Sequence, residues 1–212
     1  MQVDTLPSGL PKSIWLASRS PRRRELLEQL GIQVQLLIAQ TPEDAEALEA
    51  LRPGEAPLDY VARVTRLKLD QGISAMQQQN LTGWVLTADT TVDLHGEVLG
   101  KPETPLQAMQ MLNRLQSTLH RVHTSVAVAF VQHKQVSPLI RQTTQTSEVE
   151  FDHIPEEFTK AYVAAGTPFD KAGGYGIQSE IGQFVRRISG SYSGIMGLPV
   201  YETSMLLRDN NR

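Results

Sequence analysis

The sequence predicts an α/β fold in which a mixed, twisted sheet forms two lobes around a central cleft. A strand, a helix and a second strand follow one another within about 25 residues near the start of the chain, an order that is typical of α/β proteins. Later, an alternating strand over residues 121–131 precedes a second strand over 139–151, which suits an antiparallel partner. Because such long strands exceed one compact layer, they favour two lobes with a groove between them.

The first elements follow from a few marker residues. Apolar residues 14–18 predict a buried strand. A helix is expected after Ser20, which suits the N-cap position, with Pro21 as the first helical residue. Residues 34–38 predict a second strand. The acidic stretch 41–57 is interrupted by prolines, so we treat it as a connection.

The middle of the chain continues the alternation of helices and strands. A helix is expected over 58–76, in which Gly72 is a weak point where the helix could end early. A strong strand over 84–94, a turn over 95–97 and an amphipathic helix over 105–115 follow. The remaining expected elements are a helix over 155–165, a strand over 184–188 and a helix over 199–207.

The composition excludes several classes of protein. The chain of 212 residues suits one domain, and we expect a loose leader over 1–13 and a single two-lobed domain over 14–212. A formal net charge of −3 argues against a broadly basic nucleic-acid-binding protein, and the lack of cysteine excludes disulfides and thiolate metal sites. No apolar run reaches the ~20 residues of a membrane-spanning helix, so we expect a cytoplasmic location and no membrane partner.

The first candidate site is the arginine-rich start of the helix after Ser20. Arg22, Arg23 and Arg24 lie in its first turn, where the helix end already carries partial positive charge and unpaired N–H groups. A bound polyanion such as a triphosphate would accept hydrogen bonds from both the arginines and the unpaired N–H groups. The alternative is that these arginines extend into solvent or pair with nearby acids such as Glu28.

The second candidate is Asp89, which lies inside the strand over 84–94. Aspartate is disfavoured in strands, and a half-buried carboxylate needs a cation, a metal ion or a strong donor. Asp89 is therefore a candidate magnesium ligand or general base. The alternative is an aspartate that faces solvent on an edge strand.

Two lysines and a glycine-rich loop carry weaker signals. Lys68 and Lys101 would each be solvated charges if taken alone, and Gly100-Lys101-Pro102 does not match a phosphate-binding loop. In the loop over 170–178, three glycines allow close backbone approach. Tyr175 could stack on a base there, and Gln178 could read a base edge through its amide.

Five segments in this order resemble the Maf family of nucleotide pyrophosphatases, and the resemblance runs from about Ile14 to Leu207. The run Gly174-Tyr175-Gly176-Ile177-Gln178 is similar to the branch of the family that acts on dTTP and UTP. The sequence departs from the family around Lys68, and the connection over 41–57 is longer than usual. The five segments are Leu16-Ala17-Ser18-Arg19-Ser20-Pro21-Arg22-Arg23, Ala88-Asp89-Thr90, Gly100-Lys101-Pro102, Asp170 to Gln178, and Gly197-Leu198-Pro199.

The resemblance implies roles for individual residues and a fold like that of the Maf and inosine triphosphatase proteins. Asp89 corresponds to the family's proton acceptor. Asp89 and Glu43 would also hold a divalent cation, Mg²⁺ or Mn²⁺. The substrate-binding positions are Arg22, Thr90 and Gln178, which set substrate choice, and Ser18, Lys68 and Lys101, which line the cleft.

The resemblance also implies an enzyme, a nucleoside triphosphate diphosphatase that keeps the nucleotide pool clean. It would hydrolyse dTTP and UTP to the monophosphate and pyrophosphate, and it would form a homodimer that binds no nucleic acid. Two alternatives stay open. One is a pyrophosphatase of the same kind for another modified or methylated nucleotide, and the other is a nucleotide-binding factor of septum formation and cell division without catalysis.

Overall fold

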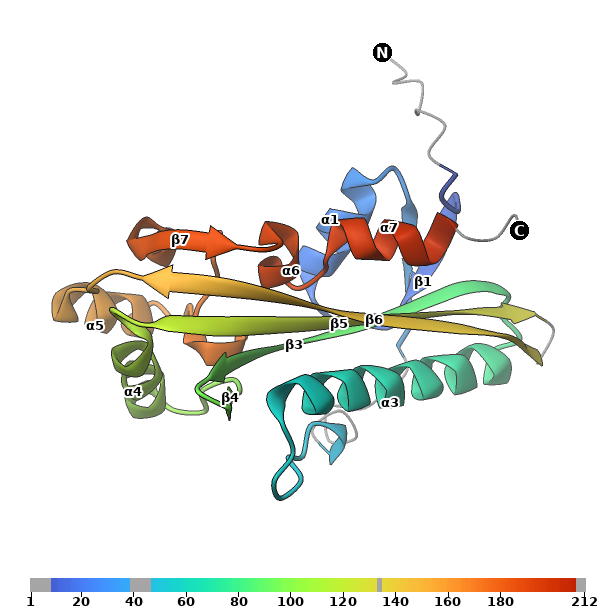
Figure 1. Cartoon of the computed structure of the whole chain (residues 1–212). Coiled ribbons are helices and arrows are strands. Elements are labelled where there is room, and N and C mark those ends of the chain that lie inside the picture. Colours follow the sequence, from blue (N-terminus) through green and yellow to red (C-terminus); the bar gives the residue numbers. More distant parts are fainter. Residues whose placement is uncertain (1–8, 39–46, 133–134, 209–212) are drawn as a thin grey trace, which may run out of the picture.

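The computed structural model describes residues 9–38, 47–132 and 135–208, and for 135–139 the backbone alone. A seven-stranded mixed sheet in the order β2-β1-β3-β5-β6-β7, with β4 paired to the end of β3, runs through the molecule (Figure 1). This confirms the predicted α/β class with a mixed sheet. The strands are β1 Ser13–Leu16, β2 Gln33–Leu36, β3 Gly83–Leu94, β4 Glu97–Leu99, β5 Leu119–Gln132, β6 Gln135–Phe151 and β7 Val185–Ser189.

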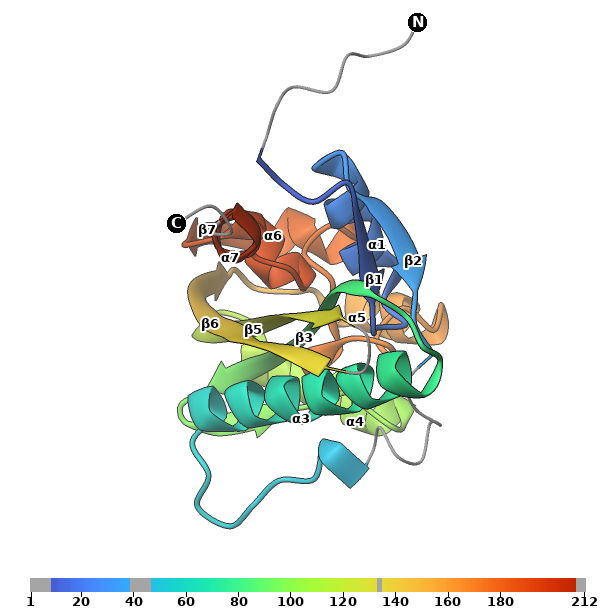
Figure 2. The ribbon, with the colours of Figure 1, turned by 90° about the vertical axis from the view of Figure 1, so that its right-hand side faces the viewer.

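Helices cover both faces and one end of this sheet (Figures 1 and 2). The long helix α3 lies along one face, while α1, α6 and α7 cover the opposite face, and α4 and α5 pack at the far end. None of the helices in the described part of the chain combines the length and the apolar character needed to cross a membrane. The helices are α1 Pro21–Gln29, α3 Pro57–Gln78, α4 Pro105–Leu115, α5 Glu156–Ala164, α6 Tyr192–Met196 and α7 Val200–Arg208.

The core follows from the alternation of apolar side chains on the long central strands. On the face of α3, Leu69, Met76 and Val85 pack together with alanines of β5, and each of these three is fully buried. The other face buries Leu16, Leu27 and neighbouring apolar side chains beneath α1 and α7. Apolar side chains at two-residue intervals on both faces of β3 thus hold helices on either side.

The helix expected over 58–76 is confirmed, and Gly72 does not end it early. The helix continues through Gly72 to Gln78. A Cβ atom at this position would lie 3.2 Å from Val85 and 3.3 Å from Ala17, so the glycine lets the helix pack closely on the sheet. The contact with β3 stabilises the helix and outweighs the ~1 kcal/mol that glycine costs in a helix relative to alanine.

The short elements that were not predicted from the sequence include the strand β4 and the helix α6. The turn expected at 95–97 closes a hairpin, because Glu97–Leu99 pairs with the end of β3 as β4. Residues 192–196 form α6, whose N-cap residue Ser191 accepts a hydrogen bond from the backbone N–H of Gly194. Both elements are too short to show a clear period in the sequence.

The strand pairing leaves an opening on one edge of β3. The parallel strand β1 follows this edge only as far as Leu86, and the antiparallel strand β4 pairs with it from Val92 onward. The edge of residues 87–91 therefore has no described strand beside it. Ligands of α/β sheets bind beyond the carboxyl ends of parallel strands, and β1 ends at this opening.

Candidate active site

A cavity of about 670 Å³ lies along the open edge of β3. It receives side chains from the end of β1, the start of α1, helix α3, the loop after β4 and the glycine-rich loop 170–178. Seven of the residues predicted as site residues line it: Ser18, Arg22, Lys68, Asp89, Thr90, Lys101 and Gln178. The structure therefore brings together residues that are far apart in the sequence. Glu43, the eighth predicted site residue, lies outside the described residues.

Asp89 is a buried carboxylate, not a surface aspartate on a solvated edge. The residue is 8% exposed, and its Oδ1 accepts a hydrogen bond of 2.6 Å from Nζ of Lys68. Lys68 reaches it from α3, on the face of the sheet toward which Asp89 points. Among the described residues, no other side chain donates a hydrogen bond to this carboxylate.

Lys68 joins Asp89 to a second carboxylate, that of Glu49. The Lys68 Nζ lies 2.7 Å from Oε1 of Glu49, and Nζ of Lys101 lies 3.7 Å from its Oε2. Burial disfavours the charged form of Lys68, but the two carboxylates outweigh it and raise the pKa of the ammonium group. Burial likewise opposes the ionisation of Glu49, but Lys68 and Lys101 lower the pKa of its carboxyl group. Lys68 and Glu49 are therefore both held in their charged forms.

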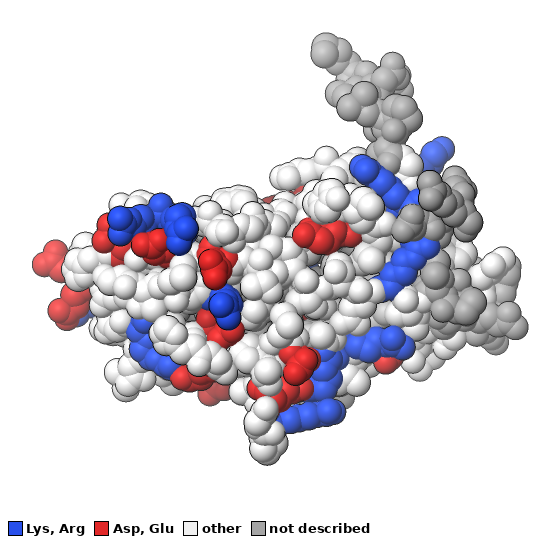
Figure 3. Space-filling view, viewed as in Figure 1, with Lys and Arg blue, Asp and Glu red and all other residues white. Residues whose placement is uncertain are grey.

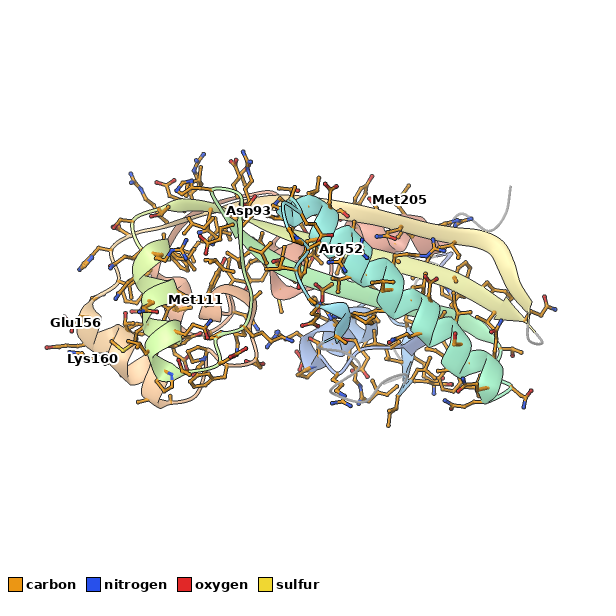
Figure 4. All side chains as sticks on the ribbon, turned by 90° about the horizontal axis from the view of Figure 1, so that it is seen from below. Arg52, Asp93, Met111, Glu156, Lys160 and Met205 are labelled. Atoms are coloured by element: carbon orange, nitrogen blue, oxygen red, sulfur yellow. The ribbon has the colours of Figure 1, made fainter. Side chains whose placement is uncertain are left out.

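Sequence reasoning missed Glu49. It lies in the connection 41–57, where an acidic run gives several equivalent candidates and no motif selects one of them. Its distance from Lys68 depends on contacts with α3 that no sequence spacing shows. Arg52 marks the segment that leads from Glu49 to the start of α3 (Figure 4).

The arginines of α1 divide between the cavity and the surface. Arg23 points inward, where its guanidinium donates to the backbone oxygen of Gly197 at 2.8 Å, to Oγ of Ser18 at 3.1 Å and to Oγ1 of Thr90 at 3.3 Å. Arg22 pairs with Asp170 at 3.1 Å, and Arg24 with Glu28 at 2.7 Å on the exposed side. The alternative of pairing with an acid is confirmed for Arg24 and Arg22, whereas Arg23 enters the cavity without a carboxylate hydrogen-bond partner among the described residues.

Thr90 and Asp89 point to opposite faces of β3, as consecutive strand residues must. The Thr90 hydroxyl lies 3.0 Å from the hydroxyl of Thr124, which in turn donates to the Gly194 carbonyl at 2.7 Å. Because the edge of β3 is open here, the cavity reaches both side chains. Thr90 is thereby held by α1 through Arg23 and by the turn that contains α6.

The glycine-rich loop forms the far wall of the cavity. Gly173 has a φ of 67°, and a Cβ there would lie 2.9 Å from a methyl group of Val92, so no larger residue fits without movement. Tyr175 is 5% exposed; its ring packs edge to face on Phe151, and its hydroxyl lies 2.7 Å from Nε2 of His120. This burial leaves little ring face for a base. Gln178, by contrast, is exposed and lines the cavity.

The donor set of the cavity fits a hard divalent cation that arrives with phosphate. Within the described residues no group of three or more His, Cys, Asp or Glu side chains could hold a metal ion without further ligands. Carboxylate oxygens are present, however, and Mg²⁺ is typically held by one or two carboxylates, water and substrate phosphates. Asp89 offers such oxygens inside a cavity that also presents lysine and arginine side chains.

Comparison with known proteins gives a consistent result. The family described as "Maf-like protein" matches residues 13–210. A protein of Cupriavidus metallidurans named dTTP/UTP pyrophosphatase is 50% identical over 197 residues, which cover 92% of this chain and 96% of that protein. Proteins with the same name from Cupriavidus pinatubonensis and Ralstonia nicotianae are 48% and 46% identical and cover 92% and 95% of this chain, and 95% and 96% of their own lengths.

Proposed function

The chain belongs to the family of Maf-like proteins, and on this basis we propose that it hydrolyses dTTP and UTP to the monophosphate and pyrophosphate. Relatives that are 44–50% identical over 92% of the chain carry that activity in their names. The observation that carries the proposal is the buried Asp89 carboxylate beside Lys68, in a cavity that also receives Arg22, Arg23 and Lys101.

The cavity answers the main difficulty of the reaction, which is attack by water on a polyanion. A nucleoside triphosphate brings about four negative charges, so its hydrolysis needs charge neutralisation, alignment and a proton acceptor. We assign proton acceptance from the attacking water to Asp89, whose carboxylate Lys68 holds in place. Arg22, Lys68 and Lys101 are assigned to the phosphates.

Base choice is assigned to Gln178 and Thr90, which both line the cavity. Gln178 is exposed to the cavity and offers both a donor and an acceptor to the edge of a pyrimidine. Thr90 contributes its hydroxyl oxygen, which Arg23 and Thr124 already orient.

A divalent cation, Mg²⁺ or Mn²⁺, would be held by Asp89 and, as the family resemblance implies, by Glu43. When bound it would neutralise phosphate charge and lower the pKa of a bound water. The homodimer and the cytoplasmic location expected from the sequence belong to the same proposal.

The test is pyrophosphate release from a panel of triphosphates: dTTP, UTP, dCTP, GTP and a methylated GTP. We expect dTTP and UTP to be the preferred substrates of the wild-type protein. Gln178→Ala should lower the ratio of kcat/KM for dTTP to kcat/KM for GTP by roughly tenfold, since one lost base contact is worth ~1–3 kcal/mol. Preference for the methylated GTP, or no pyrophosphate from any triphosphate, would contradict the proposal.

A further inference from the structure

Glu49 lies where an anion would bind. Its two carboxylate oxygens face Lys68 at 2.7 Å and Lys101 at 3.7 Å, and both lysines line the cavity. A carboxylate that bridges two ammonium groups presents the same chemistry as a phosphate oxygen pair. The Glu49 side chain is 29% exposed, so it sits at the mouth of the cavity and is not sealed into the core.

The segment that carries Glu49 is fixed to α3 by three consecutive backbone carbonyl groups. Arg63 donates to the carbonyl oxygens of Leu48 at 3.3 Å and Ala50 at 3.0 Å, and the Tyr60 hydroxyl donates to that of Glu49 at 3.0 Å. Arg63 also forms a two-fold ion pair with Glu55, with N–O distances of 2.5 and 2.7 Å. These contacts hold the backbone of Glu49 where its carboxylate faces both lysines.

We propose that Glu49 takes the place of a substrate phosphate between Lys68 and Lys101 until substrate binds, and that Arg63 and Tyr60 are positioning residues that hold it there. The proposal rests on the proposed function, because it takes the two lysines as phosphate-binding groups. Glu49 then balances their charge while the site is empty, and a polyphosphate must displace it.

This arrangement has a consequence for selectivity. The affinity of the site for an anion is reduced by the fraction of molecules in which Glu49 already occupies the lysines. An anion of high charge displaces the carboxylate more readily than one of low charge. The site therefore favours triphosphate and pyrophosphate over a nucleoside monophosphate, which assists release of the product that carries the base.

The direct test is the binding of inorganic tripolyphosphate, measured by calorimetry in the presence of EDTA. Glu49→Gln removes the competing charge and keeps the size of the side chain. We expect it to bind tripolyphosphate on the order of tenfold more tightly than the wild type, because the anion no longer has to displace a charged carboxylate from the lysines. In turnover, it should lower KM for dTTP more than it changes kcat.

Asp59→Asn is the matched control. Asp59 is exposed in the first turn of α3, so the substitution makes the same change of charge outside the cavity. The affinity of the Asp59→Asn protein for tripolyphosphate should equal that of the wild type. If Glu49→Gln does not fold, Glu49→Asp gives the same test, since its shorter side chain cannot reach both lysines equally. Its expected gain in affinity is smaller.

Arg63→Lys tests the positioning role. It loses the contacts with the carbonyl groups, and it should raise tripolyphosphate affinity in the wild-type background but add nothing to Glu49→Gln. A Glu49→Gln protein that binds tripolyphosphate as the wild type does, or more weakly, overturns the proposal. Absence of tripolyphosphate binding in both the wild type and Glu49→Gln also overturns it. A protein that binds tripolyphosphate but releases no pyrophosphate from dTTP refutes the proposed function, while the comparison of affinities still stands.

Discussion

Two lysine–carboxylate pairs of nearly equal length lie in contrasting regions of the molecule. Lys68 and Asp89 are 2.6 Å apart in the cavity, with 12% and 11% of their side chains exposed. Lys160 and Glu156 are 2.7 Å apart on α5, with 58% and 71% exposed (Figure 4). The distances hardly differ, so the difference in environment decides what each pair does.

Burial gives the cavity pair a strong and specific electrostatic interaction. Water screens the pair on α5, and helix pairs of this spacing contribute only ~0.3–0.5 kcal/mol. On the face seen in Figure 3, Lys and Arg side chains likewise lie beside Asp and Glu side chains at the surface. In the cavity the Lys68–Asp89 pair is shielded from water, so removal of one partner leaves the other charge buried and uncompensated. Ion pairs should therefore be judged by burial, not by length.

Of the two lysine substitutions that test this comparison, Lys68→Met has the larger expected effect. This change leaves Asp89 and Glu49 without the cation between them and removes one contact for phosphate. We expect kcat/KM for dTTP to fall by roughly 10²-fold or more, in the range typical of the loss of one preorganised electrostatic group. Pyrophosphate release measures it. Activity within threefold of the wild type would break the comparison between the two pairs.

A buried histidine at the far end of the sheet sharpens the comparison. His120 is 2% exposed; it contacts the Tyr175 hydroxyl and the Phe151 ring, and no carboxylate in the described part of the chain pairs with it. Burial lowers the pKa of its imidazole to about 4, whereas Lys68, also buried, has its pKa raised by two carboxylates. Burial therefore favours the neutral form of a side chain that lacks a charged partner, whereas a buried side chain with such a partner stays charged.

This contrast predicts a loss of stability in acid. The unfolded chain binds a proton at His120 below about pH 6.5, and the folded chain only near pH 4, so the free energy of unfolding falls as pH drops between these values. The contribution is up to about 3 kcal/mol, at 1.36 kcal/mol per pKa unit. Urea unfolding at pH 7 and pH 4.5 measures it. His120→Gln should lose less stability over this interval, and an equal loss in both proteins would count against the assignment.

The smallest effect is expected for Lys160→Met, the exposed counterpart of Lys68→Met. The free energy of unfolding should change by less than about 0.5 kcal/mol, and dTTP turnover should be unchanged. Urea unfolding and pyrophosphate release, run beside Lys68→Met, provide the measurement. A large loss of activity in this variant would show that burial is not what separates the two pairs.

Much of the fold could be predicted because its main elements carry strong periodic signals. The helix over 105–115 has the predicted bounds, and the strand over 84–94 begins one residue earlier, at Gly83. Asp89 stood out because a carboxylate in such a strand conflicts with local preference, and the structure places it in the cavity. Here the local sequence contains the signal.

Other features depend on contacts between distant parts of the chain. Gly72 does not end α3. The lack of a side chain there lets the helix pack closely against Val85 and Ala17. Glu49 reaches the lysines from a segment whose backbone carbonyl groups accept hydrogen bonds from Arg63 and Tyr60, and no spacing along the chain shows these contacts. Arg22 and Arg23 are adjacent in the sequence and both line the cavity, but Arg22 pairs with Asp170 while Arg23 donates to Thr90 and Ser18.

The measurement that bears most directly on the assigned role of the buried carboxylate is pyrophosphate release from dTTP by Asp89→Asn. The amide keeps the size of the side chain and removes its capacity to accept a proton. We expect kcat to fall by roughly 10²- to 10⁴-fold, the usual loss when a positioned base is removed, while tripolyphosphate still binds. Wild-type turnover by this variant would contradict the role of Asp89 as the proton acceptor.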